Sequence, residues 1–164
     1  MLRATFSGIA LASLLCFGPT ASAAVIHFSV PLSGLQEVAA GDPDGFGQAD
    51  LYIDNVAQTI SWNITANNID PIGAAHIHNA PAGVNGGVVV DFSGQLIGAN
   101  VVDADVRSIL ANPTAYYVNL HNLAYPGGAI RGQLGAPVPE PATLALLGLG
   151  IAGVGFARRR VASR

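Results

Sequence analysis

The sequence predicts an all-β fold, a single antiparallel β-sandwich over residues 24–136 with one short helix. Residues 49–54 and 60–65 alternate between apolar and polar side chains, and this period of two is typical of strands with one buried face. Clusters of Asn, Asp, Gly and Pro separate such stretches, as turns do in antiparallel sheets. Short strands joined by turns, with little helix between them, favour a sandwich over an α/β fold.

The other elements follow from the same patterns. We expect a helix over 104–111, with Asp103 as its N-cap and Pro113 just past its end. Further strands are expected near residues 25–32, 73–79, 86–92, 115–121 and 128–134.

The N-terminal residues 1–23 are a predicted secretory signal peptide. Arg3 precedes the apolar run 9–17, and Ala21-Ser22-Ala23 matches a cleavage site. The run is shorter than the ~18 residues of a membrane span. Cleavage after Ala23 would also remove Cys16, the one cysteine of the chain. The exported domain would then fold without a disulfide.

The charge balance excludes some classes of partner. Residues 24–136 hold nine acidic residues and two arginines, a formal net charge of −7, and the chain has no lysine. Nucleic acids and anionic lipids are bound through basic surfaces, so neither is expected as a direct partner of the domain. No serine lies in a nucleophile elbow and no glycine-rich phosphate loop is present, so no enzyme class is indicated.

The C-terminal residues 137–164 form a segment of three parts that is typical of a membrane anchor. Its parts are, in order, the tripeptide Pro139-Glu140-Pro141, the uncharged residues 142–157 and the cluster Arg158-Arg159-Arg160. A helix over 142–157 would cover about 24 Å at ~1.5 Å per residue, slightly less than the hydrocarbon core of a bilayer, and arginines that reach the headgroups make up the difference. We therefore expect a transmembrane helix with its arginines in the cytoplasm and the domain outside.

This order of parts closely resembles the PEP-CTERM sorting signal. The resemblance implies a Gram-negative bacterium that makes exopolysaccharide, and cleavage by an exosortase near the Pro-Glu-Pro motif. It also implies a transient membrane anchor, followed by release to the cell surface or the extracellular matrix.

Four segments of the domain resemble the CHRD family. They are "LSGLQEV" at 32–38, "AAHIHNAPAGVNGGVVVDF" at 74–92, "YVNLHN" at 117–122 and "PGGAIRGQL" at 126–134. The resemblance implies a Greek-key sandwich that is immunoglobulin-like or superoxide-dismutase-like. It implies no activity, because no general biochemical role is established for the family.

Three histidines are candidate metal ligands. Residues i and i+2 of a strand share a face, so His76 and His78 project together. His121 lies on the face of its strand that points away from the core. If strands 74–79 and 115–121 are neighbours, three imidazoles converge, and imidazole suits copper and zinc. The alternative is that these histidines form hydrogen bonds that fix the loops, and the sequence leaves both interpretations open.

The pattern is also similar to copper/zinc superoxide dismutase. By that likeness His76, His78 and His121 match three copper ligands, and Arg131 in "GGAIRG" matches an anion-attracting arginine. The departures are a missing metal-bridging histidine, a missing zinc loop and a missing disulfide. His27 matches nothing in that pattern.

The segment "DPDGFGQAD" offers a second candidate, a calcium loop. Asp42, Asp44, Gly47 and Asp50 fit positions 1, 3, 6 and 9 of such a loop, but Phe46 and Ile53 replace two of its oxygen ligands. We favour a hairpin loop here.

The function expected from these features is that of a non-enzymatic, exported surface or matrix protein. Its expected partners are the Sec export machinery, an exosortase and an exopolysaccharide. The alternative is a copper- or zinc-binding protein with a redox or metal-handling role.

Overall fold

The computed structural model describes residues 25–69, 71–138 and 148–152. Residues 148–152 are helical. In chain order the other elements are β1 (Val25–Ser33), the 3₁₀ turn η1 (Gly34–Gln36), β2 (Phe46–Asp54), β3 (Thr59–Asn67), β4 (Ile72–Asn79), β5 (Gly87–Asp91), β6 (Ile97–Val102), α1 (Val106–Ala111), η2 (Pro113–Ala115), β7 (Tyr116–Asn122) and β8 (Ile130–Gln133).

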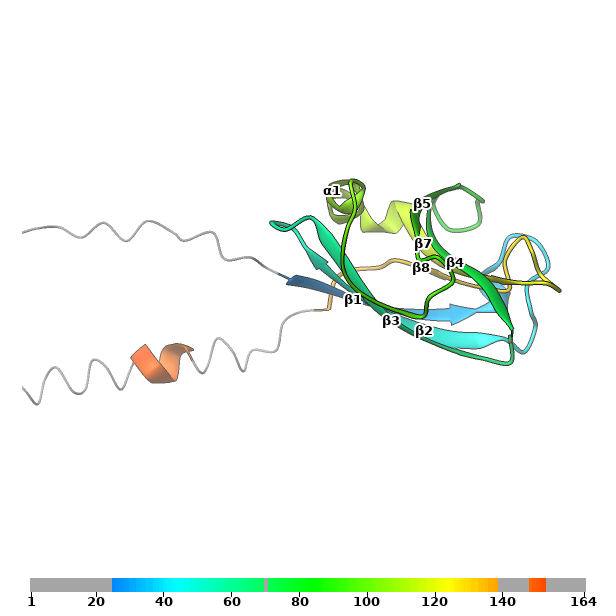
Figure 1. Ribbon diagram of the computed structural model, residues 1–164, viewed down its shortest axis with the longest axis horizontal. Helices are drawn as coiled ribbons and strands as arrows, with labels where there is room; N and C mark the ends of the chain where they lie inside the picture. Colours follow the sequence, from blue (N-terminus) through cyan, green and yellow to red (C-terminus); the bar gives the residue numbers. More distant parts are fainter. Residues whose placement is uncertain (1–24, 70, 139–147, 153–164) are drawn as a thin grey trace, which may run out of the picture.

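The eight strands form one curled antiparallel sheet in the order β5-β4-β7-β8-β1-β2-β3-β6. The curl gives two layers, with β1, β2 and β3 in one and β4, β5, β7 and β8 in the other (Figure 1). The layers are continuous because β8 pairs with β1 where Arg131 lies opposite Ser33. The predicted all-β, sandwich-like fold is thus confirmed, with its layers joined along one seam.

The core lies between the two layers. On β2 and β3 the alternation predicted from the sequence puts Leu51, Ile53, Ile60 and Trp62 inside. Such burial contributes about 25 cal/mol per Å² of apolar surface removed from water. The indole N–H of Trp62 donates to the Gln95 carbonyl at 2.9 Å, which satisfies the one polar group of this side chain.

Strand β6 was not expected from the sequence. Five of its six residues are exposed, so it lacks the alternation that identifies a strand. It pairs with β3 beside Trp62, where a Cβ on Gly98 would lie 2.2 Å from the indole ring. A glycine is therefore needed for β6 to approach this ring.

The helix is shorter than expected. It begins at Val106 with Asp105 as N-cap, so the predicted N-cap Asp103 is two residues too early. Asp103 still contributes, because its carboxylate accepts the backbone N–H of Asp105 at 2.8 Å. Pro113 follows the helix and opens η2, as expected.

The two ends of the described domain lie side by side. Val138 forms an isolated bridge with His27 of β1, and its N–H donates to the His27 carbonyl at 2.8 Å. The predicted signal peptide at 1–23 lies outside the described residues. So do Pro139, Glu140, Pro141 and Arg158, Arg159 and Arg160, with most of the expected transmembrane segment 142–157. Among the residues described, no helix has the length and apolar character required to cross a membrane.

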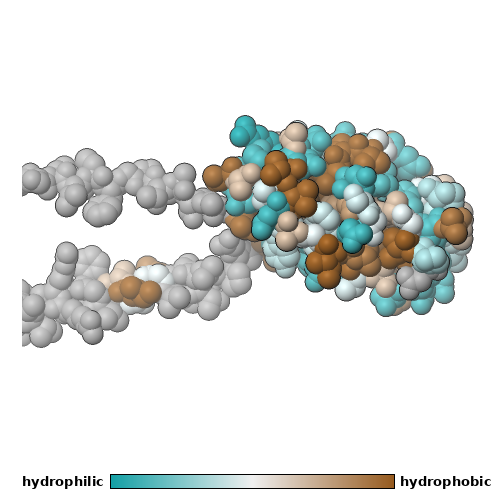
Figure 2. All heavy atoms as spheres, viewed as in Figure 1, coloured by the Kyte–Doolittle hydropathy of each residue, from teal (hydrophilic) through white to brown (hydrophobic). Residues whose placement is uncertain are grey.

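The surface shows no dominant apolar area on the face in view. Hydrophobic side chains there form several separate patches between hydrophilic ones (Figure 2). Scattered apolar residues of this kind are normal on exported and soluble domains alike.

Candidate metal centre

The site is built on the antiparallel pair β4 and β7. Their register places Ala74 opposite His121, His76 opposite Asn119 and His78 opposite Tyr117. The expectation that these strands are neighbours is confirmed. His121 is therefore diagonal to His76 on the same face, which brings the two side chains together.

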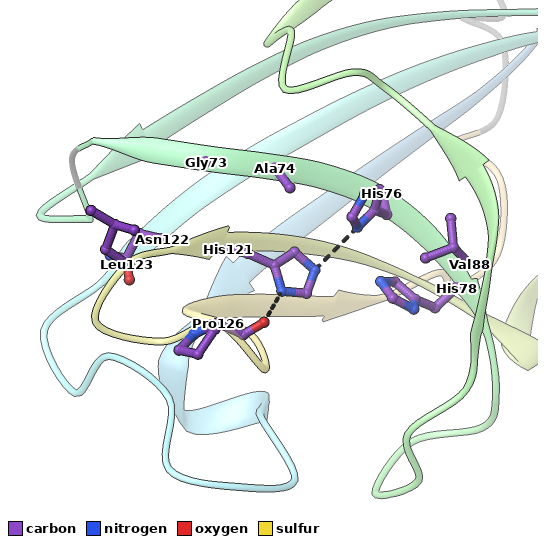
Figure 3. Close-up of a pocket in the computed structure, with 9 residues that line it drawn as sticks. All are labelled: Gly73, Ala74, His76, His78, Val88, His121, Asn122, Leu123 and Pro126. Atoms are coloured by element: carbon purple, nitrogen blue, oxygen red, sulfur yellow. Dashed lines mark hydrogen bonds between the residues drawn. The ribbon is translucent and has the colours of Figure 1, made fainter.

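The three imidazoles converge at one point (Figure 3). The Nδ1 atom of His76 lies 3.2 Å from Nε2 of His121. The ring centroid of His78 is 5.4 Å from that of His76 and 5.7 Å from that of His121. Each ring offers one nitrogen, and the three nitrogens lie within 4.8 Å of one another. Within the described residues, these three histidines are close enough together to bind one metal ion.

The outer nitrogens of two rings are held by carbonyl oxygens. Nδ1 of His78 is 3.0 Å from the Gly86 carbonyl, and Nδ1 of His121 is 3.1 Å from the Pro126 carbonyl. A carbonyl only accepts, so each Nδ1 must carry the proton. In the neutral ring the lone pair is then on Nε2, the atom that faces the other histidines.

His76 has a different arrangement. Because Nε2 of His121 carries a lone pair, the 3.2 Å contact requires the proton on Nδ1 of His76. The other nitrogen of His76, Nε2, lies 3.7 Å from a carboxylate oxygen of Asp91. That carboxylate is oriented by the backbone N–H of Ser93, which donates to it at 2.6 Å.

Burial keeps two of the rings neutral. Desolvation is the main cause that lowers the pKa of His78 below its usual value, and the hydrogen bond to the Gly86 carbonyl opposes this only in part. Burial likewise lowers the pKa of His121. The Nε2 atom of His78 is buried and has no hydrogen-bond partner. A neutral, buried and unpartnered nitrogen of this kind is a potential ligand atom.

A loop covers the outer face of β7 and β8 beside the histidines. We call residues 80–86, between β4 and β5, the covering loop. Arg131 holds it by donating to the Val84 carbonyl at 2.9 Å and to the Pro81 carbonyl at 3.0 Å. The Gly86 N–H donates to the Tyr117 hydroxyl at 3.1 Å, and the guanidinium carbon of Arg131 lies 3.4 Å from the centre of the Tyr117 ring.

These contacts favour a structural role for Arg131. An arginine that attracts a soluble anion needs donors that face solvent, whereas Arg131 is 1% exposed and donates to carbonyls of the protein. The anion-attracting role suggested by the sequence is therefore not supported by its surroundings.

A pocket of about 340 Å³ opens next to the histidines. Its other lining residues are small or apolar for the most part, as Figure 3 shows: Gly73, Ala74, Val88, Asn122, Leu123 and Pro126. A ligand atom bound at the point where the imidazoles meet would be reached through this pocket.

The remaining sequence candidates lie elsewhere. Gly47 and Asp50 are paired in extended β2, opposite Ala66 and Asn63, so they do not curve around an ion as a calcium loop would. The hairpin interpretation fits this geometry. His27 is on β1, where it contacts Asp50 at 2.9 Å and stacks on Tyr52.

Sequence reasoning missed Asp91 and the covering loop. Asp91 lies opposite His76 in the β4–β5 pair, and that register contains a bulge that periodicity does not reveal. The abundance of glycine and proline in 80–87 indicated a loop but not the face that it covers.

Comparison with known proteins gives two matches to family models. The model of the CHRD domain matches residues 28–134, and the model of the PEP-CTERM protein-sorting motif matches residues 137–160. No curated protein and no solved structure matches the chain. The sorting motif implies processing by an exosortase and a place at the cell surface or outside the cell. The chain belongs to the CHRD-domain family and carries a C-terminal PEP-CTERM sorting motif.

Proposed function

We propose that this protein is a non-enzymatic component of the cell surface or the extracellular matrix, in contact with exopolysaccharide. The observation that carries the proposal is the PEP-CTERM match at residues 137–160, directly after the CHRD match at 28–134. In this proposal the Sec machinery exports the chain, residues 142–157 anchor it for a time, and an exosortase releases it.

Two properties of the domain are compatible with a location outside the cell. Its strands enclose an apolar core, and no cysteine falls within residues 24–136, so folding requires no oxidant. The acidic charge of −7 disfavours adhesion to nucleic acids and anionic lipids. A neutral or cation-bridged polysaccharide remains compatible with this surface.

Intact-mass analysis of the protein from its host tests the processing. The expected mature form lacks residues 1–23 and the segment after about Pro141. Glu140→Ala should block the C-terminal cleavage, whereas the matched change Pro137→Ala, outside the tripeptide, should leave it intact. A mature protein that retains residues 142–157 would contradict the proposal.

Cell fractionation tests the association with polysaccharide. In a host strain that makes exopolysaccharide, the processed protein should sediment with the matrix. In an otherwise identical strain without the polysaccharide it should appear in the medium. Equal distribution in both strains would remove the polysaccharide from the proposal and leave sorting unaffected.

A redox or metal-handling role is the second candidate. One observation favours it, the convergence of His76, His78 and His121 within 4.8 Å. It is compatible with export and sorting, since the site lies within the domain that the exosortase would release.

A further inference from the structure

We propose that His76, His78 and His121 bind one divalent transition metal, and that Asp91 positions His76 for this role. The ligand atoms are Nδ1 of His76 and Nε2 of His78 and His121. The inference deepens the second candidate function and rests on it, while export and sorting do not depend on it.

The unpartnered nitrogen of His78 is the first argument. Nε2 of His78 is buried without a hydrogen-bond partner, although its ring is fixed by the Gly86 carbonyl at 3.0 Å and by stacking on Tyr117 at 4.9 Å between centroids. A buried polar atom without a partner costs about 1–3 kcal/mol. A metal ion at the meeting point of the imidazoles would give this lone pair a partner.

The outer contacts of all three rings are the second argument. Histidines that bind metals usually donate their other N–H to a carbonyl or a carboxylate, which fixes the tautomer and the ring orientation. Gly86 and Pro126 provide such carbonyls for His78 and His121. Asp91 places a carboxylate oxygen 3.7 Å from Nε2 of His76, so the two side chains need to approach slightly for Asp91 to accept that N–H. Two outer nitrogens are thus held by carbonyl acceptors, and a carboxylate lies near the third.

Metal binding requires one proton to move. In the metal-free protein the Nδ1 proton of His76 is shared with Nε2 of His121 at 3.2 Å. On binding, Nδ1 gives its lone pair to the metal, and the proton resides on Nε2 instead, where it faces Asp91. The ring stays neutral, so the exchange needs no oxidant and no net change in protonation of the protein.

The distances require only a small contraction. Nitrogens bound to one metal at ~2.0 Å lie roughly 3–4 Å apart. The pair from His76 and His121 is already within this range at 3.2 Å, and the whole set spans no more than 4.8 Å. Rotation of the His76 and His121 side chains, which are only partly buried, can supply the difference.

The electrostatic balance favours a cation through Asp91 and the acidic domain. Arg131 opposes it, because its positive charge repels a cation. The guanidinium is directed to the covering loop, however, and its donors are engaged there. Three nitrogen ligands leave a position open, and it faces the pocket of about 340 Å³. Copper(II) should bind more tightly than zinc, following the usual order for nitrogen ligands.

Titration calorimetry with copper(II) and with zinc tests the site. The full chain is used without a histidine tag, in detergent and after treatment with a chelator. The expected result is one copper ion per chain with sub-micromolar affinity, and weaker binding of zinc. Electron paramagnetic resonance of the copper complex should show coupling to imidazole nitrogens. Absence of binding, or spectra without such coupling, would overturn the proposal.

Variants assign the ligands. His121→Gln should weaken copper binding more than about 100-fold, since the loss of a direct ligand exceeds the 10–100-fold effect of an outer contact. His27→Gln, the change of the one histidine outside the cluster, should not alter the affinity. Circular dichroism and the unfolding midpoint show whether each variant is folded. Copper should also raise the midpoint of the wild-type chain but not that of His121→Gln, and equal shifts in both would overturn the proposal.

Asp91 is tested separately from the ligands. Asp91→Asn should weaken copper binding about 10-fold, and nitrogen NMR of the zinc complex should show the Nε2–H tautomer of His76 in the wild type. Unchanged affinity in Asp91→Asn, with binding still lost in His121→Gln, would reject the role of Asp91 alone. Because Glu140→Ala affects processing and none of the histidine variants should, failure of the metal site and failure of the sorting proposal remain distinguishable.

Discussion

The two layers of the sheet bury their strands in different ways. In β2 of the first layer, Ala49, Leu51 and Ile53 face the core, while Tyr52 on the opposite face is exposed. In β7 of the second layer, six of the seven residues are buried, on both faces of the strand. The difference arises because the covering loop lies over β7 and β8, whereas the outer face of β2 meets solvent.

This second buried face is polar, and its groups need partners. Arg131 and Gln133 find theirs in carbonyls of the covering loop and of β7. Two side-chain atoms on the same layer do not, Nε2 of His78 and Oδ1 of Asn119. A strand that is buried on both faces and has polar atoms without partners provides an enclosed polar position for a ligand. A strand with one face in solvent does not.

Among the substitutions that test the difference between the two layers, removal of Arg131 should change the free energy of unfolding most. Arg131→Met eliminates the donors to Pro81 and Val84 and should lower the free energy of unfolding by about 3 kcal/mol, since buried acceptors lose charge-assisted bonds. The matched control is Arg107→Met, whose exposed side chain bonds Gln58, and it should change stability by less than about 0.5 kcal/mol. Urea unfolding measures both. Equal losses would mean that the covering loop is not held by Arg131.

Substitution of Asn119 should have a smaller effect on the free energy of unfolding, and it should raise this free energy. Its side chain is 2% exposed and its carbonyl oxygen has no partner, so Asn119→Leu should stabilise the metal-free chain by about 1 kcal/mol. The comparable change on the open layer, Asn63→Leu, replaces an exposed side chain on β3 and should have little effect. Thermal unfolding of the two variants gives the comparison. A destabilised Asn119→Leu would show that the amide has a structural partner such as a bound water.

The smallest expected change in stability comes from the ionisation of Glu37 as the pH rises. Burial raises the pKa of this carboxyl to about 7, and the charge of Arg131 opposes the shift. In the unfolded chain the group ionises near 4.5. The folded state therefore holds its proton longer, and stability from this group falls as pH rises from about 4.5 to about 7.

Glu37→Gln should remove this dependence. At pH 8 the variant should be more stable than the wild type by less than about 1 kcal/mol, because solvent screens a half-buried group. At acidic pH the two should converge. The lowered pKa values of His78 and His121 act in the opposite direction, but they are common to both proteins and cancel in the difference. A constant difference between pH 5 and 8 would contradict the shifted pKa.

The sequence predicted the strands of both layers except β6. A strand with one exposed face shows an alternation of apolar and polar residues in its sequence. This alternation identified β2 and β3 and the residues of each that face the core. The meeting of His76 and His121 also followed, since the spacing of two within each strand fixes the shared face. Strand β6 was missed because its residues are nearly all exposed, and its place depends on one contact with Trp62.

The rest of the site depends on contacts distant in sequence. Arg131 was expected to attract anions, yet it lies under a loop some 50 residues earlier in the chain, as its bond to Pro81 shows. Asp91 reaches His76 only through a bulged register. Neither a local pattern nor a charge count encodes such pairings, because they are decided by how the loops pack on the finished sheet.

The bridge between Val138 and His27 has a mechanical consequence. A chain held at its C-terminal end and pulled outward carries the load first through the Val138 N–H, a single bond to the His27 carbonyl. That hydrogen bond can break by itself, and the exposed residues just before Val138 then extend the free C-terminal segment. Force then reaches β8, which is bound to neighbours on both sides, to β7 and to β1. Tension on the tail thus frees residues 135–138 before it reaches Leu134, which is buried in the core and donates its N–H to the Tyr116 carbonyl at 2.9 Å.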